Sequence, residues 1–321
     1  MLLAFLLTVV GLVILIVAGD LLVRGAVNLS LRLGVPAMIV SLTVVAFGTS
    51  APELVISIGA ILDGAPGIAL GNVVGSNTAN VLLVLGVPAL IATIGMDDPE
   101  TRRSFVLMLV ASVVFIALAF VGPMKWWHGL ILLAVFGLIL GGQIRTSLAH
   151  RRSARAAKAA LPVSDDEVEG ADPNIGGGKI AFFLIAGIVS LPIGAQMLIT
   201  GARTIAETFG VSDEVIGLTL VAIGTSLPEL ATTVAAAFRR QADVAIGNVI
   251  GSNTFNLLAI FGIALLVGPV PVEREFLRVD LWVMLAASVA LTPFVFRDWK
   301  LGRLFGAVFC LLYITYVWMI V

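Results

Sequence analysis

The stretch VVAFGTSAPELVIS at residues 44–57 places Glu53 directly after Pro52, inside a long apolar run. The same stretch holds a glycine and the hydroxyls of Thr49 and Ser50, and almost no other charge lies nearby. An acidic side chain at the centre of a membrane costs about 2.5–3.5 kcal/mol even on insertion scales, so it usually serves a function. Whether the chain spans a membrane therefore decides how Glu53 is interpreted.

The composition of the chain is typical of a polytopic membrane protein. Of its 321 residues, 60% are hydrophobic and 12% are charged, and the mean hydropathy is +1.11, whereas soluble domains hold about 25% charged residues. The net charge of −1 gives no indication of a nucleic-acid partner. The single cysteine, Cys310, lies in an apolar run, so an intrachain disulfide is excluded. Residues 1–19 lack a basic start, so we expect a first membrane helix there and not a secretory signal.

Apolar runs between polar breaks predict an all-α protein with ten membrane helices, since a span needs about 20 mostly apolar residues. The predicted spans cover approximately residues 2–29, 36–62, 68–94, 103–121, 125–148, 179–206, 213–238, 243–268, 277–296 and 301–320.

The distribution of basic residues predicts the orientation. Of the 19 Lys and Arg residues, fifteen lie in or beside the connections after spans 1, 3, 5, 7 and 9, and four lie on the other side. Because cytoplasmic connections are rich in Lys and Arg, we expect the connections after the odd-numbered spans in the cytoplasm. Both termini then lie on the outer side of the cell (inner) membrane. The polar stretch 149–178 is then a cytoplasmic linker, with a short helix expected around 149–160. Its acidic run at residues 165–169 is interpreted as solvated linker and not as an ion site.

The stretch around Glu53 has a counterpart later in the chain. SLTVVAFGTSAPEL at 41–54 matches GLTLVAIGTSLPEL at 217–230 in ten of fourteen positions, and GNVVGSNTANVLLVLG at 71–86 matches GNVIGSNTFNLLAIFG at 247–262 in ten of sixteen. Both alignments share an offset of 176 residues. The chain is therefore interpreted as two homologous five-helix halves, 1–148 and 179–321. Because five is odd, the halves must enter the membrane in opposite senses, as in inverted-repeat transporters with a site at the midplane.

Each half has a proline next to its glutamate, and this predicts that spans 2 and 7 are broken helices. Pro52 removes a hydrogen bond to the carbonyl of Gly48, so we expect carbonyls from Ala46 to Gly48 without helical partners. Such backbone is tolerated at membrane depth only where it is buried in protein or lines a wet cavity. The oxygens of carbonyls, hydroxyls and carboxylates suit hard cations.

A simpler interpretation is a proline kink beside a protonated glutamate. The same proline and glutamate occur in both halves, at Glu53 and Glu229, and this repetition makes the simple kink the weaker interpretation.

The second motif predicts a polar wall that faces the glutamates. Asn72, Ser76 and Asn80 recur every four residues and form one stripe on a helix, and Asn248, Ser252 and Asn256 repeat it. Ser76 and Asn80 are the better candidates for ion binding because they lie deeper in the span, whereas Asn72 and Asn77 are expected to join helices.

These paired GTSxPE and GNxxGSNxxN motifs resemble the Ca²⁺/cation antiporter superfamily, especially its sodium/calcium exchanger branch. The resemblance covers essentially the whole chain and implies a core of spans 2, 3, 7 and 8, with spans 1 and 6 sliding against it. It also implies a site for each ion. The Ca²⁺ site would be formed by Glu53, Glu229, Thr49 and Thr225. The Na⁺ sites would be formed by Ser50, Ser226, Ser76, Ser252 and the carbonyls of Ala46 and Ala222, with Asn80 and Asn256 facing the centre.

One position departs from the superfamily pattern. Some exchangers have an aspartate in one copy at the position of Asn80 or Asn256, whereas both are asparagine here. The core then has two carboxylates and not three, which leaves the ion stoichiometry and any potassium coupling open.

The resemblance implies a secondary antiporter that exchanges Na⁺ for Ca²⁺ by alternating access. The alternatives are an H⁺/Ca²⁺ exchanger, a Na⁺-coupled transporter of another divalent cation and, less favoured, a cation channel. We expect no enzyme, since His128 and His150 lie near span ends and form no arrangement typical of catalysis. The expected partners are Ca²⁺, Na⁺ or H⁺ and the lipid bilayer, with no cofactor and with a monomer as the acting unit.

Overall fold

The structure is a computed structural model that describes residues 1–96, 98–160, 175–209, 224–297 and 299–320. Within these ranges every regular element is a helix, and two isolated antiparallel bridges join Ile94 to Leu301 and Met124 to Val270. The prediction of an all-α polytopic membrane protein is therefore confirmed.

Seven helices in the described ranges are long and apolar enough to cross a membrane. Four of them are α1 (Leu2–Leu33), α7 (Pro99–Phe120), α8 (Trp126–Ala160) and α9 (Gly177–Thr208). Two contain a π-helical turn. They are Pro66–Ile91, with α5 (Pro66–Ala79), η2 (Asn80–Val84) and α6 (Gly86–Ile91), and Ala242–Val267, with α13 (Ala242–Thr254), η4 (Phe255–Ile260) and α14 (Phe261–Val267). The seventh, Phe276–Phe296, begins within the short α15 (Arg274–Arg278) and includes α16 (Asp280–Val289) and α17 (Thr292–Phe296).

A bent pair of helices makes an eighth candidate span if its two arms are counted as one. Its first arm contains α2 (Ala37–Val40), η1 (Ser41–Val45) and α3 (Ala46–Thr49), and its second arm is α4 (Ala51–Leu62), at 41° to the first. Two further apolar helices are shorter, α12 (Leu227–Phe238) and α18 (Arg303–Ile320). The first part of the predicted span 213–238 lies outside the described residues, so the count of ten stays a prediction.

The linker prediction is tested only at its ends. Helix α8 continues without a break to Ala160, so the helix expected around 149–160 is the end of α8. Helix α9 begins at Gly177, and the acidic run at 165–169 lies outside the described residues.

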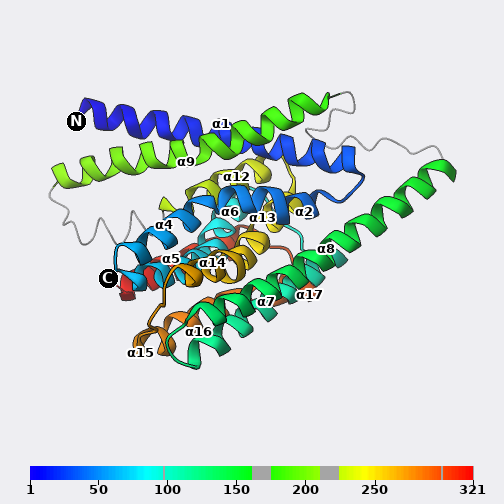
Figure 1. The fold of residues 1–321 in the computed structure, drawn as a ribbon. Coiled ribbons are helices and arrows are strands. Elements are labelled where there is room, and N and C mark those ends of the chain that lie inside the picture. The colour runs from blue at the N-terminus through cyan, green and yellow to red at the C-terminus, as the bar shows by residue number, and fades with distance from the viewer. Residues whose placement is uncertain (97, 161–174, 210–223, 298, 321) are drawn as a thin grey trace.

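Helices α1 and α9 lie side by side along one edge of the molecule (Figure 1). Glycines allow their backbones to approach closely, because a Cβ atom on Gly11 would lie 2.6 Å from Leu198 N and one on Gly187 would lie 2.8 Å from Leu22 Cβ. The side chains of α1 and α9 that lie outside this contact mostly face away from the molecule, since only 28% of the 18-residue apolar stretch of each helix is buried.

The most deeply buried span is Ala242–Val267, with 83% of its apolar window buried. Figure 1 shows α13 with α4, α5 and α12 between the α1–α9 pair and the group formed by α7, α8 and α16. Both glutamate motifs and both asparagine stripes are carried by these central helices or by the turns that precede and follow them.

Candidate ion-binding site

The two glutamates occupy equivalent positions at the start of two helices. Ser50 precedes α4 with φ −89° and ψ 7°, and Ser226 precedes α12 with φ −87° and ψ 3°. Proline follows two residues later in each case, where the first turn of a helix needs no N–H donor. Glu53 and Glu229 thus lie in first turns, where the positive end of the helix dipole favours a negative charge.

The predicted break at Pro52 is confirmed by the 41° bend, but its effect on the carbonyls is smaller than expected. The Ala46 carbonyl was expected to lack a helical partner. It accepts the backbone N–H of Ser50 at 3.0 Å and the Thr49 hydroxyl at 3.3 Å. The expectation for Ala46 is therefore wrong, because the helix continues to Thr49 before the chain turns at Ser50.

The structure brings the two glutamates into one buried cluster, which we name the carboxylate cluster: Glu53, Glu229, Ser50 and Ser252. Ser50 Oγ donates to Glu229 Oε1 at 2.9 Å, and Ser252 Oγ donates to the same oxygen at 3.4 Å. Both glutamates are fully buried, and their carboxylates interact electrostatically with each other. Two negative charges in a low-dielectric interior require a positive partner or a proton.

Most of the carboxylate oxygens have no hydrogen bond. Within the described part of the chain, neither oxygen of Glu53 has a partner, and neither does Glu229 Oε2. The hydroxyl of Ser226 is also unpaired, although Ser50, its counterpart in the first half, donates to a glutamate. Buried oxygens are normally paired, so these atoms are free to bind a cation or to accept a proton.

The serines of the two stripes lie against the threonines of the opposite half. Thr49 Oγ1 lies 3.5 Å from Ser252 Oγ, and Thr225 Oγ1 lies 3.4 Å from Ser76 Oγ. These two contacts are equivalent under the 176-residue offset. Each hydroxyl is a neutral oxygen that suits a hard cation.

Asn72 and Asn248 connect helices, as the sequence predicted for Asn72. Asn72 Nδ2 donates to Ser57 Oγ at 3.1 Å and to the Glu53 carbonyl at 3.2 Å. Asn248 Nδ2 makes the equivalent bonds to Thr233 Oγ1 at 3.3 Å and to the Glu229 carbonyl at 3.4 Å. Each amide therefore fixes the helix turn that carries a glutamate, and Ser57 and Thr233 were not identified from the sequence.

Asn80 and Asn256 are both fully buried but differ in their partners. Asn80 Nδ2 donates to Asn253 Oδ1 at 3.0 Å, whereas neither amide atom of Asn256 has a partner among the described residues. Both side chains belong to π-helical segments, η2 and η4, and π-helical turns often occur at functional sites. Periodicity in the sequence did not predict these turns, and Asn253 was not singled out.

Eleven of the twelve predicted site residues are described, and all eleven are buried. They are Ala46, Thr49, Ser50, Glu53, Ser76, Asn80, Thr225, Ser226, Glu229, Ser252 and Asn256. Ala222 lies outside the described residues. No group of three or more His, Cys, Asp and Glu side chains gathers at one point within the ranges that the structure covers. The cluster therefore offers two carboxylates, with neutral oxygens around them.

The sequence profile of the sodium/calcium exchanger protein family matches residues 3–145 and 179–321. The chain belongs to this family. The two matched segments carry all of the cluster residues described above, so the family assignment and the site rest on the same parts of the chain.

Individual relatives cover nearly the whole chain. A putative antiporter, CaxA of Alkalimonas amylolytica, is 35% identical over 99% of this chain and 97% of its own length. The sodium/calcium exchanger MaX1 of Methanosarcina acetivorans is 34% identical over 98% and 97%. A solved structure of the sodium-calcium exchanger NCX_Mj, soaked with Na⁺ and Sr²⁺, has a TM-score of 0.82 at 31% identity and covers 98% of this chain and 97% of its own.

Proposed function

We propose that this chain is a secondary antiporter that exchanges Na⁺ for Ca²⁺ across a membrane by alternating access. The observation that carries the proposal is the pair of fully buried carboxylates, Glu53 and Glu229, with three oxygens that have no partner in the described part of the chain. A set of oxygens without nitrogen or sulfur is selective for hard cations. Membership in the sodium/calcium exchanger family supports the choice of Na⁺ and Ca²⁺.

In this proposal Ca²⁺ lies between Glu53 and Glu229, and oxygens of Thr49 and Thr225 complete its shell. Na⁺ ions use Ser50, Ser226, Ser76 and Ser252, together with the carbonyls of Ala46 and Ala222 and with Asn80 and Asn256 at the centre.

Ca²⁺ and Na⁺ compete because they share the carboxylates. Two carboxylates balance one Ca²⁺ or two Na⁺ ions, so the two loads exclude each other. A ligand shifts the balance between two conformations only by binding one of them more tightly than the other. The ion-loaded core therefore changes from one access state to the other, whereas the empty core, with its uncompensated charge, resists this change. Exchange follows, and the chain acts as a carrier and not as an enzyme.

We infer that the two halves, 1–148 and 179–321, are inverted repeats of five spans each. Helices α1 and α9 correspond at the 176-residue offset, and their contacts run antiparallel. Gly25 lies against Leu184, and its counterpart Gly201 lies against Thr8, which is the counterpart of Leu184. A twofold relation in the plane of the membrane produces this reciprocal pattern.

We propose that the chain lies in the inner membrane of the cell and crosses it ten times. Both termini are then outside, and the linker 149–178 is in the cytoplasm. Two observations support the alternation of sides. Ile94 pairs with Leu301, and both follow odd-numbered spans, 3 and 9, whereas Met124 and Val270 pair after even-numbered spans, 4 and 8. Asp20, in the second half of α1, forms an ion pair with Arg239, which directly follows α12.

The test is uptake of ⁴⁵Ca²⁺ into proteoliposomes that hold the purified chain. We expect uptake when Na⁺ is loaded inside and absent outside, and no uptake when the Na⁺ gradient is replaced by an H⁺ gradient. Uptake that follows the H⁺ gradient alone would favour an H⁺/Ca²⁺ exchanger. Flux that needs no counter-ion and does not saturate would favour a channel. Uptake of another divalent ion in preference to Ca²⁺ would change the substrate and keep the mechanism.

A further inference from the structure

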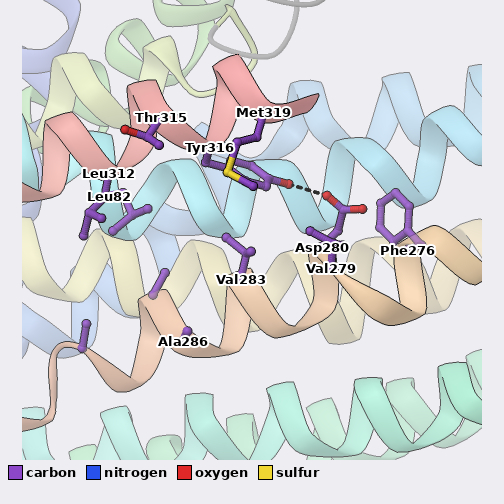
Figure 2. Close-up of a pocket in the computed structure, with 12 residues that line it drawn as sticks. Leu82, Phe276, Val279, Asp280, Val283, Ala286, Leu312, Thr315, Tyr316 and Met319 are labelled. Carbon is purple, nitrogen blue, oxygen red and sulfur yellow. Dashed lines mark hydrogen bonds between the residues drawn. The ribbon is translucent and has the colours of Figure 1, made fainter. Parts of the chain in front are cut away.

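A cavity lies between α16 and α18, and none of the residues of the carboxylate cluster lines it. It has a volume of about 760 Å³ and is lined by side chains that are almost all apolar, among them Leu82, Val283, Ala286 and Leu312 (Figure 2). Pockets that hold small molecules commonly measure about 300–1,000 Å³. We name this cavity the α16–α18 groove.

The groove contains one carboxylate. Tyr316 Oη donates to Asp280 Oδ1 at 2.8 Å, and Figure 2 shows both side chains on the wall of the groove. Asp280 makes no ion pair with a basic side chain in the described ranges, and Oδ2 accepts no hydrogen bond there. A negative charge beside apolar walls favours a ligand that brings its own positive charge and a hydrocarbon part.

The position of Asp280 indicates the headgroup level of the bilayer. Trp282, two residues further, is 49% exposed, and its indole N–H bonds to the Leu277 carbonyl. Exposed tryptophans mark the interface between membrane and water. Arg278 is exposed two residues before Asp280. A cation and an anion at this level match the phosphate and the ammonium of a zwitterionic phospholipid.

We propose that the α16–α18 groove binds one phosphatidylethanolamine molecule, with its ammonium group on Asp280 and one acyl chain along Val283, Ala286 and Leu312. The primary ammonium has three N–H donors for the carboxylate. A choline headgroup has none, so the groove discriminates between the two lipids.

The bound lipid contacts the transport core through Leu82. This residue lines the groove and belongs to η2, the π-helical turn that begins at Asn80. An occupied groove therefore packs against the back of the segment that carries a predicted ion ligand. This consequence for transport rests on the proposed function, whereas lipid binding itself does not.

The experiment measures the lipid that the purified chain retains in native mass spectrometry, after reconstitution in equal parts of phosphatidylethanolamine and phosphatidylcholine. The wild type is expected to retain one phosphatidylethanolamine per chain. Asp280→Asn should lower the retained fraction of phosphatidylethanolamine about tenfold, because it removes one charge-assisted hydrogen bond. Ala286→Trp, which fills the groove, should remove both lipids. Glu273→Gln, an exposed acid on the connection before α15, is the matched control and should behave as wild type.

Equal retention of the two lipids by the wild type would overturn the proposal, and so would retention that survives both Asp280→Asn and Ala286→Trp. Size-exclusion profiles check the fold of each variant, and either variant alone suffices if the other fails to fold. Ca²⁺ uptake in vesicles with and without phosphatidylethanolamine is measured separately. If no variant takes up Ca²⁺ in either lipid, the proposed function fails. The mass spectrometry result still decides whether the groove binds phosphatidylethanolamine.

Discussion

Ser50, in the first half of the chain, donates a hydrogen bond to Glu229 in the second half, 179 residues away. Ser50 lies at the bend between α3 and α4, three residues before Glu53, so this contact joins the two GTSxPE motifs directly. The equivalent hydroxyl, Ser226 Oγ, has no partner in the described part of the chain. The two serines thus have the same backbone conformation but different hydrogen bonds, which is the asymmetry that the proposed alternating access requires of a single access state.

Removal of either buried carboxylate should abolish exchange. Glu53→Gln and Glu229→Gln each keep the shape of the side chain and remove one of the two negative charges that balance Ca²⁺. We expect Na⁺-driven ⁴⁵Ca²⁺ uptake to fall by about 100-fold or more, since each carboxylate is a direct ligand in the proposed site. Glu273→Gln is the control, because Glu273 is exposed. Wild-type uptake by either buried variant would contradict the proposed site.

Ser50 should affect Na⁺ more than Ca²⁺. Ser50→Ala removes an oxygen assigned to Na⁺ and a hydrogen bond to Glu229, which is worth about 1.5–3 kcal/mol for a charged acceptor. We expect the Na⁺ concentration for half-maximal exchange to rise about tenfold, and that for Ca²⁺ to change less than about threefold. Ser112→Ala is the control, since Ser112 is buried on α7 and bonds only within its own helix, to Met108. Equal shifts for the two ions would argue against separate roles.

The sequence predicted the helical class, the central helices and the break near Pro52, because apolar runs, proline and the 176-residue repeat are local signals. It did not predict the π-helical turns at Asn80 and Phe255, since a single extra residue in a helix leaves no trace in an apolar pattern. The Asn80–Asn253 bond and the difference between Ser50 and Ser226 were also inaccessible. Both depend on side-chain positions that only packing of the two halves determines.

The ion pair between Asp20 and Arg239 should influence the rate of exchange and not ion affinity. It links α1 to the end of α12, and both side chains are partly exposed. Movement of α1 against the core must break it, so Arg239→Gln should change turnover at saturating ion concentrations by up to about fivefold, the range of a pair worth about 1 kcal/mol.

Arg24→Gln is the matched control for this prediction. Arg24 pairs with the same Asp20 at 3.0 Å but lies four residues away on α1, so this pair persists when α1 moves. Turnover is measured by ⁴⁵Ca²⁺ uptake and the half-maximal concentrations by titration. A shift in half-maximal Na⁺ or Ca²⁺ with unchanged turnover, or equal effects of Arg239→Gln and Arg24→Gln, would contradict a role in the movement.

The close contact between α1 and α9 should make Gly187 intolerant of any side chain. A Cβ atom there would lie 2.8 Å from Leu22 Cβ and 3.0 Å from the Ala18 carbonyl oxygen, so α1 would have to shift. Gly137, on α8, has nothing within 4 Å of the same position. Gly187→Ala should destabilise the protein by about 1–3 kcal/mol through overpacking, whereas Gly137→Ala should stabilise it by up to about 1 kcal/mol, since alanine favours a helix more than glycine. Thermal unfolding in detergent measures the difference, and ⁴⁵Ca²⁺ uptake shows whether a tight α1–α9 contact is also needed for transport. Equal unfolding temperatures for the two variants would mean that the helices separate easily, which the reciprocal glycine contacts of Gly25 and Gly201 argue against.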